Sequence, residues 1–111
     1  MPHWTAFGEC SLSLYCAVTL KERRHVVKSL LDGIQSRFNV SYADVSPMAE
    51  DMRNIRLGFA AAGSSRAELE ERMCSIRSYI SQREENGGEF EVVDFTWEAL
   101  AYGDLSYTKD K

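Results

Sequence analysis

The sequence predicts an α+β domain in which a four-stranded antiparallel sheet carries two helices on one face. Three observations predict it: strand-like alternation near both ends of the chain, two amphipathic segments that each follow a capping box, and two adjacent strand-like segments between them. The resulting order is strand, helix, strand, strand, helix, strand. Because crossover connections are right-handed, the first and third strands should be central, and both helices should cover the same face. This arrangement is the ferredoxin-like fold.

The first strand is predicted over residues 7–16, "FGECSLSLYC". Its residues alternate between two faces, with Cys10, Leu12, Leu14 and Cys16 on one and Ser11, Ser13 and Tyr15 on the other. Cys10 and Cys16 are separated by roughly 20 Å along such a strand, which is too far for a disulfide. The spacing of the three cysteines is not typical of a zinc site, so we expect free buried thiols and no metal or other cofactor.

The first helix is predicted over residues 20–37. Thr19 and Glu22 form a capping box at its start, and its apolar face is formed by Leu20, Val27, Leu30, Leu31, Ile34 and Phe38. The segments "FNVSYADV" and "RNIRLGFAAAG" then predict a hairpin of two strands, joined by a segment that contains Pro47.

The second helix is predicted over residues 66–84, after a second capping box formed by Ser65 and Glu68. Its narrow apolar stripe consists of Leu69, Met73, Ile76 and Ile80, and Cys74 is expected to lie in the core. "ENGG" ends the helix, and "EFEVVDFTWEAL" predicts the fourth strand.

Length and composition predict a single domain over residues 1–111, with a core over about 7–100 and a flexible tail over 101–111. The chain is 44% hydrophobic and 27% charged, and no apolar run is long enough to span a bilayer. The apolar stretch at residues 10–20 follows Glu9 rather than basic residues, unlike a signal peptide, so we expect a cytoplasmic protein.

Charge is distributed unevenly along the chain. Residues 1–83 hold eleven Lys or Arg against nine Asp or Glu, which is +2, and residues 84–111 hold two against eight, which is −6. Within the first part, helical spacing i, i+3, i+4, i+7 places four residues on one outward face, which we call the basic stripe: Lys21, Arg24, His25 and Lys28. Arg23 borders the apolar face, and Arg37 lies further along the helix.

Three interpretations of these cations remain open. They could form a solvated face paired with Glu22 or Asp32, they could bind RNA phosphates, or they could dock the acidic segment "EENGGEFE" of the same chain. A cation in the first turn of a helix opposes the helix dipole at a cost of about 0.3 to 1 kcal/mol, which favours a compensating partner. The RNA hypothesis assigns binding to Lys21, Arg23, Arg24, His25, Lys28 and Arg37, with ribosomal RNA or ribosomal particles as the partner.

The sheet face away from the helices is expected to be open. Its central positions are mostly small or polar, with one aromatic residue, which argues against stacking of bases as in RNA-recognition motifs. Such a face is either simply solvated or a homodimer surface that allows close approach of another copy. The residues assigned to this dimer face are Ser11, Ser13, Tyr15, Arg56, Gly58 and Ala60.

We find no catalytic constellation in the sequence. There are two histidines, His3 near the terminus and His25 in the basic stripe, and no nucleotide-binding or hydrolase motif. The carboxylates of the fourth strand, Glu91, Asp94 and Glu98, are typical of solvated edge charges that prevent aggregation.

Several long stretches resemble the YlxP-like family of small bacterial proteins: "TLKERRHVVKSLLDGIQSRFNVSYADV", "RLGFAAAGSSRAELEERMCSIRSYI" and "FEVVDFTWEAL". The resemblance covers about residues 10–100. The chain departs from the family pattern at two places. Before the first helix, family members usually have a turn of small residues that includes Gly, where this chain has Tyr15, Cys16 and Ala17. Before the third strand, family members often have a segment that contains Trp, where this chain has "EDMRN". The resemblance implies a ferredoxin-like fold and an unassigned activity, with genes often beside those of translation initiation and ribosome maturation.

Three functions therefore follow as hypotheses: an RNA- or ribosome-associated binding module, a homo-oligomeric interaction or small-molecule-sensing domain, and an uncharacterised enzyme. The residues favour a non-enzymatic binding module.

Overall fold

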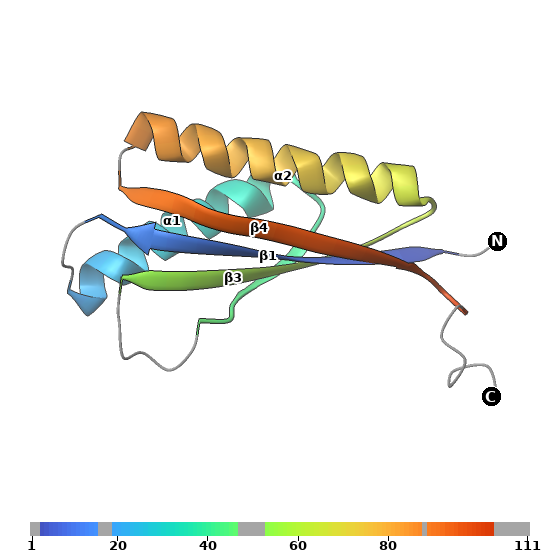
Figure 1. Cartoon of the computed structure of the whole chain (residues 1–111), viewed down its shortest axis with the longest axis horizontal. Helices are drawn as coiled ribbons and strands as arrows, with labels where there is room; N and C mark the ends of the chain where they lie inside the picture. The colour runs from blue at the N-terminus through green and yellow to red at the C-terminus, as the bar shows by residue number, and fades with distance from the viewer. Residues whose placement is uncertain (1–2, 16–18, 47–52, 88, 104–111) are drawn as a thin grey trace.

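A computed structural model describes residues 3–15, 19–46, 53–87 and 89–103. It has the predicted element order, and all strand pairs are antiparallel in the sheet order β2-β3-β1-β4, so the ferredoxin-like fold is confirmed. Both helices lie on the same side of the sheet, α2 along β4 and α1 behind β1 and β3 (Figure 1). The elements are β1 (Trp4–Leu14), α1 (Leu20–Arg37), β2 (Ser41–Asp44), β3 (Asn54–Gly63), α2 (Arg66–Gly87) and β4 (Phe90–Ala101).

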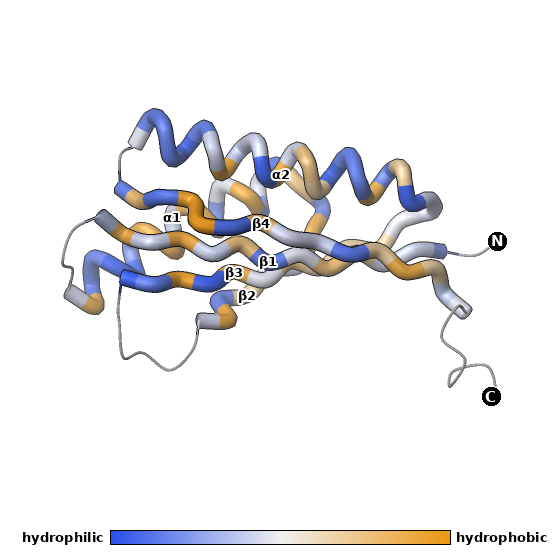
Figure 2. Tube along the Cα trace, viewed as in Figure 1, coloured by the Kyte–Doolittle hydropathy of each residue, from blue (hydrophilic) through white to orange (hydrophobic). Residues whose placement is uncertain are grey.

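The core lies between the sheet and the two helices. It takes alternate residues from β1 and β3, and the alternation of hydrophobic and hydrophilic residues along β3 is visible in Figure 2. The four residues of the predicted α2 stripe are all buried. From the predicted face of α1, Val27, Leu30, Leu31 and Ile34 are buried, Phe38 is partly buried against the core, and Val26 is buried in addition. The prediction is wrong for Leu20, which is 46% exposed in the first turn of α1. The helix-facing side of the sheet and the apolar helix stripes therefore form one continuous core.

The two capping boxes differ. At α1 the box is complete, because the Thr19 hydroxyl accepts from the Glu22 N–H at 3.1 Å and the Glu22 carboxylate accepts from the Thr19 N–H at 2.9 Å. At α2 the Ser65 hydroxyl accepts from the Glu68 N–H as predicted, but the Glu68 carboxylate accepts from the Ser64 N–H instead of that of Ser65. Ser64, which is not part of the capping-box motif, therefore also stabilises the start of α2.

The first strand is shifted towards the N-terminus relative to the prediction. It begins at Trp4 and ends at Leu14, so Tyr15 lies beyond the strand. The His3 carbonyl accepts a hydrogen bond from the Tyr102 N–H, and the two rings stack with centroids 5.0 Å apart. These contacts continue the β1–β4 pairing past Ala101, whereas residues 104–111 of the expected tail lie outside the described residues.

The predictions for the cysteines are confirmed in one case and wrong in another. Cys10 is buried on β1, and burial, helped by the negative charges of Asp94 and Glu84, raises the pKa of its thiol to about 12. Cys74 is exposed on α2, not in the core. It directly follows the buried Met73 in sequence, and one helical step of about 100° rotates its side chain out of the narrow buried stripe. Cys16 lies outside the described residues.

The helices approach each other closely at Gly33. A Cβ at this position would overlap the hydroxyl of Tyr79 on α2, so glycine is required for this close packing. The Tyr79 hydroxyl accepts a hydrogen bond from the Arg83 guanidinium at 3.0 Å, and Arg83 also donates to the Ser29 hydroxyl at 3.0 Å. Tyr79 and Arg83 therefore connect the two helices on the side away from the sheet.

This close packing predicts the effect of Gly33→Ala. In an ordinary helix the change would stabilise the protein by about 1 kcal/mol. Here the added methyl group meets Tyr79, and overpacking costs about 1 to 3 kcal/mol, so we expect a lower free energy of unfolding in urea. In a Tyr79→Ala background the same change should be neutral or stabilising. A full stabilisation by Gly33→Ala with Tyr79 present would contradict this packing.

The cysteine environments predict different reactivities. We expect iodoacetamide to modify Cys74 in the native protein and Cys10 only after unfolding, because a buried thiol with a raised pKa supplies little thiolate. Mass-spectrometric mapping of the alkylated peptides at increasing urea concentration measures how far each of the two cysteines is modified. Equal rates for the two cysteines in the native protein would show that the burial of Cys10 is wrong.

Candidate functional site

The four residues of the basic stripe are all exposed along the first half of α1. The complete capping box fixes the start of the helix, and the burial of Val27 and Leu31 turns the stripe away from the core. Helical spacing therefore brings Lys21, Arg24 and Lys28 together as the sequence predicted.

Arg23 has a different environment from the stripe. Its side chain is only 11% exposed, and its guanidinium pairs with the Asp44 carboxylate at 3.3 Å and donates to the Ser46 hydroxyl at 2.8 Å. Burial alone would raise the pKa of Asp44, but hydrogen bonds from Ser46 and the Arg23 charge outweigh it and lower the pKa. Arg23 thus joins α1 to the end of β2, although its Nε is buried without a partner among the described residues.

Lys28 is the one stripe residue with an ion pair to a described residue. Its ammonium lies 2.9 Å from the Asp32 carboxylate, but both side chains are more than half exposed, so the pair is weak and exchangeable. Lys21, Arg24 and His25 have no hydrogen bond or ion pair within the described part of the chain. The interpretation of a self-paired face is therefore correct for Lys28 alone.

Apart from Asp32, two of the expected acidic partners of the stripe are engaged elsewhere. The Glu22 carboxylate accepts hydrogen bonds at Thr19, whose N–H lowers its pKa. In the segment "EENGGEFE", the Glu84 carboxylate accepts a hydrogen bond from the Val92 N–H at 2.8 Å. These contacts do not involve the stripe, which leaves its outward charges facing solvent.

A shallow groove of about 350 Å³ lies beside the stripe, between α1 and the edge strand β2. Arg24 and Lys28 lie on its rim, and Val27, Leu31 and Tyr42 provide an apolar floor. The Tyr42 hydroxyl donates to the Gln35 side chain at 2.8 Å, which fixes the ring in place. Asp44 and Asp32 also line the groove, where they pair with Arg23 and Lys28. Arg24 beside this apolar hollow suits a ligand that presents negative charge together with a flat or apolar group.

Arg37 does not belong to this surface. It lies at the other end of α1, sixteen residues from Lys21 and hence about 24 Å away along the helix axis. Its guanidinium lies over the Tyr79 ring, 4.9 Å from the centroid. Burial alone would raise the pKa of Tyr79, but Arg83 and Arg37 together lower it. Arg37 therefore helps to hold α1 against α2.

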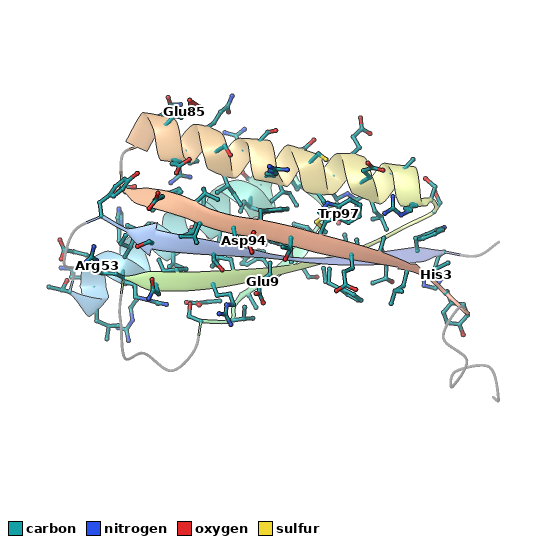
Figure 3. The ribbon with its side chains drawn as sticks, in the orientation of Figure 1. His3, Glu9, Arg53, Glu85, Asp94 and Trp97 are labelled. Atoms are coloured by element: carbon teal, nitrogen blue, oxygen red, sulfur yellow. The ribbon has the colours of Figure 1, made fainter. Side chains whose placement is uncertain are left out.

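Arg53 is a basic residue that was not among the residues predicted to bind RNA. It lies at the end of the molecule where α1 begins (Figure 3), and its guanidinium donates to the Leu14 carbonyl at 3.2 Å. The residue precedes β3, more than twenty positions after the stripe, so no periodic pattern connects it with α1. Only the three-dimensional fold brings it to the same end of the molecule.

The outer face of the sheet carries the other predicted surface. The strand registers and burial patterns place Ser11, Ser13, Arg56, Gly58 and Ala60 on this face. The Arg56 guanidinium pairs with the Glu9 carboxylate at 3.5 Å, diagonally across β1 and β3.

Two residues differ from the expectation for this face. The Val45 side chain covers Gly58 and would lie 3.3 Å from a Cβ there, so the small size of Gly58 serves packing within the chain. Tyr15, beyond the end of β1, is exposed but does not continue the strand. Of the residues predicted for this face, Ser11, Ser13, Arg56 and Ala60 therefore lie on it as expected.

Two further observations concern the described residues. Within the described residues, no group of three or more His, Cys, Asp or Glu side chains is arranged to hold a metal ion. Neither described helix is long and apolar enough to cross a membrane.

Solved structures with a similar arrangement have low sequence identity to this chain. One is described as "Structural Genomics, protein YJCS", with a TM-score of 0.48, 12% identity and coverage of 85% of this chain and 96% of the other. Another is a dimeric ferredoxin-like protein of unknown function from Thermobifida fusca, with a TM-score of 0.45, 10% identity and coverage of 87% and 91%.

Sequence comparison is more specific. A relative described as "Uncharacterized protein YlxP" from Bacillus subtilis (strain 168) is 34% identical over 74 residues, which are 67% of this chain and 79% of the relative. The family model "Protein of unknown function (DUF503)" matches residues 5–97, from the start of β1 to Trp97 in β4. The chain therefore belongs to the DUF503 family, in agreement with its resemblance to YlxP-like proteins.

Proposed function

We propose that this protein is a non-enzymatic module that binds structured RNA, with ribosomal RNA as the first candidate, through the basic stripe of α1. The observation that carries the proposal is the set of exposed basic residues at the helix start, of which Lys21, Arg24 and His25 have no partner among the described residues. Cations here oppose the helix dipole, and a bound polyanion would offset that cost.

The comparison with α2 supports a specific role for the stripe. On α2, Arg66 pairs with Glu70 at 3.4 Å and Arg72 with Glu68 at 3.0 Å, each one turn away. The first half of α1 lacks such a regular pattern, because only Lys28 has a carboxylate one turn away as a partner. The charges of Lys21 and Arg24 are therefore available to an external anion.

The contact chemistry favours the phosphate backbone over the bases. The outer face of the central strands presents one exposed aromatic, Phe7, within the described residues, so it lacks the pair of stacking platforms used by RNA-recognition motifs. A row of cations along one helix instead matches successive phosphates of a folded RNA. The groove beside Arg24 and Lys28, with the Tyr42 ring in its floor, would accept one unpaired base. The ribosomal context that the family resemblance implies makes RNA the first polyanion to test.

Salt dependence and charge reversal test the proposal. With about four phosphates contacted and roughly 0.7 to 0.9 counterions released at each, the logarithm of the association constant for ribosomal RNA should fall with log salt at a slope near −3. Lys21→Glu/Arg24→Glu should weaken binding and bring the slope nearer zero by about one for each phosphate that is no longer neutralised. Acidic residues suit the first turns of a helix, so the variant should remain folded.

Arg77→Glu provides the matched control for Arg24→Glu. Arg77 is an exposed cation on α2, and helical spacing places it with Arg66 and Glu84 on the side near β4. Both variants change the charge by the same amount, but only Arg24→Glu should reduce RNA affinity. Equal affinities for parent, Arg24→Glu and the double variant would overturn the proposal, and easier unfolding of the double variant at unchanged affinity would assign the stripe to stability.

A further inference from the structure

On the outer face of the sheet, a positive and a negative side chain lie on opposite sides of the central strand β1. In the row through Ser11 of β1, Arg56 of β3 lies on one side and Asp94 of β4 on the other. Figure 3 shows Glu9 and Asp94 on this part of the sheet. Arg56 and Asp94 have opposite charge and lie one strand spacing, about 4.8 Å, from β1 on either side.

The same face becomes apolar towards the start of β1. In the row through Thr5, Ala62 of β3 and Leu100 of β4 flank β1, and β4 is hydrophobic over its last three residues (Figure 2). Between the two rows lies Phe7, which points outward from β1 and is 42% exposed. The exposed part of this ring would be stabilised by burial against an apolar surface.

A hollow adjoins Phe7 on this face. It has a volume of about 320 Å³, and its corners are the outward residues Phe7, Glu9, Thr96 and Glu98 around the paired backbones of Gly8 and Trp97. Its floor is fixed, because Met73 of α2 packs against Gly8 from the helix side. An exposed aromatic ring and a hollow of suitable size thus lie side by side on one surface.

We propose that this face binds a second copy of the chain, with the sheets packed face to face about a two-fold axis that runs along β1. Rotation about this axis exchanges the two flanking strands, so β4 of each copy lies over β3 of the other. The rotation places Asp94 of each copy opposite Arg56 of the other, so the pair occurs twice, and it places Leu100 opposite Ala62 in the same way. Phe7 lies at the axis, where the two rings pack together and fill the hollows.

Near the axis, the charges of Glu9 and Arg56 are compatible with this packing, and Glu98, at the rim of the hollow, lies opposite Ala60 of the second copy. Glu9 approaches its own copy there, but each Glu9 is already paired with Arg56 of its own chain. The Arg56 side chain is 48% exposed, and its guanidinium has five donors, so it has capacity for Asp94 of the second copy.

The size of the face predicts a weak dimer. Three strands at about 4.8 Å spacing and roughly 33 Å long, together with the four residues of β2, present about 500 Å² per copy, which is at the low end for specific interfaces. The basic stripe lies across the helix layer from this face, so the dimer would carry two stripes pointing away from each other. Self-association therefore does not compete with the surface proposed for RNA.

Sedimentation equilibrium over a dilution series tests the proposal without RNA. The parent should approach twice the 12.6 kDa chain mass at high micromolar concentration and dissociate on dilution. Arg56→Asp and Asp94→Arg should each be monomeric over the same range, and the double variant Arg56→Asp/Asp94→Arg should recover the dimer because the exchanged charges again pair. Glu91→Arg is the matched control, since Glu91 also faces outward from β4 but lies opposite Ser13, one row beyond the proposed pair.

Phe7→Ser supplies a second, independent measurement. It should remove the dimer while leaving the circular-dichroism spectrum and the unfolding transition of the monomer intact, because Phe7 points away from the core. A parent that stays monomeric at high micromolar concentration would overturn the proposal. A dimer that survives in both single charge variants and in Phe7→Ser would overturn it as well.

Discussion

The packing of both helices against one face of the sheet is the constraint on which the other features of this structure depend. Two right-handed crossovers bring α1 and α2 to the same side of β1 and β3, and the apolar stripes of both helices are used up in that one core. Two surfaces are left over: the outward side of the helix layer and the opposite face of the sheet. The proposed RNA contact and the proposed self-association use one of these each.

Local contacts make the charged start of α1 compatible with folding. The complete capping box at Thr19 satisfies two backbone N–H groups and places the Glu22 carboxylate near the positive end of the helix dipole. Arg23 pairs with Asp44 and so joins α1 to β2 with a cation that would otherwise repel its neighbours. These contacts hold the helix end in place, and the remaining cations are free to serve a role other than stability.

The order of the elements, the bounds of α1 and most of the core could be predicted from the sequence. These features follow from the periodicity of apolar residues and from capping motifs, which involve only residues a few positions apart along the chain. The sequence was not sufficient for features that depend on contacts between segments far apart along the chain. Periodicity indicates that Arg37 is a helix cation, but not that Tyr79 of α2 lies beneath it. It indicates a small residue at Gly58, but not that Val45 covers it. Cys74 was assigned to the core because it lies next to Met73, whereas a stripe this narrow buries only the residues directly on it.

If the basic stripe binds RNA in the cell, RNA should remain bound to the protein when it is recovered from a native lysate. The parent protein and the Arg24→Glu variant are purified side by side at low and at high salt, and the RNA that remains bound is quantified and sequenced. The account predicts that the parent retains ribosomal RNA at low salt, releases it at high salt, and retains more than Arg24→Glu. Equal, background-level RNA with both proteins at low salt would contradict it.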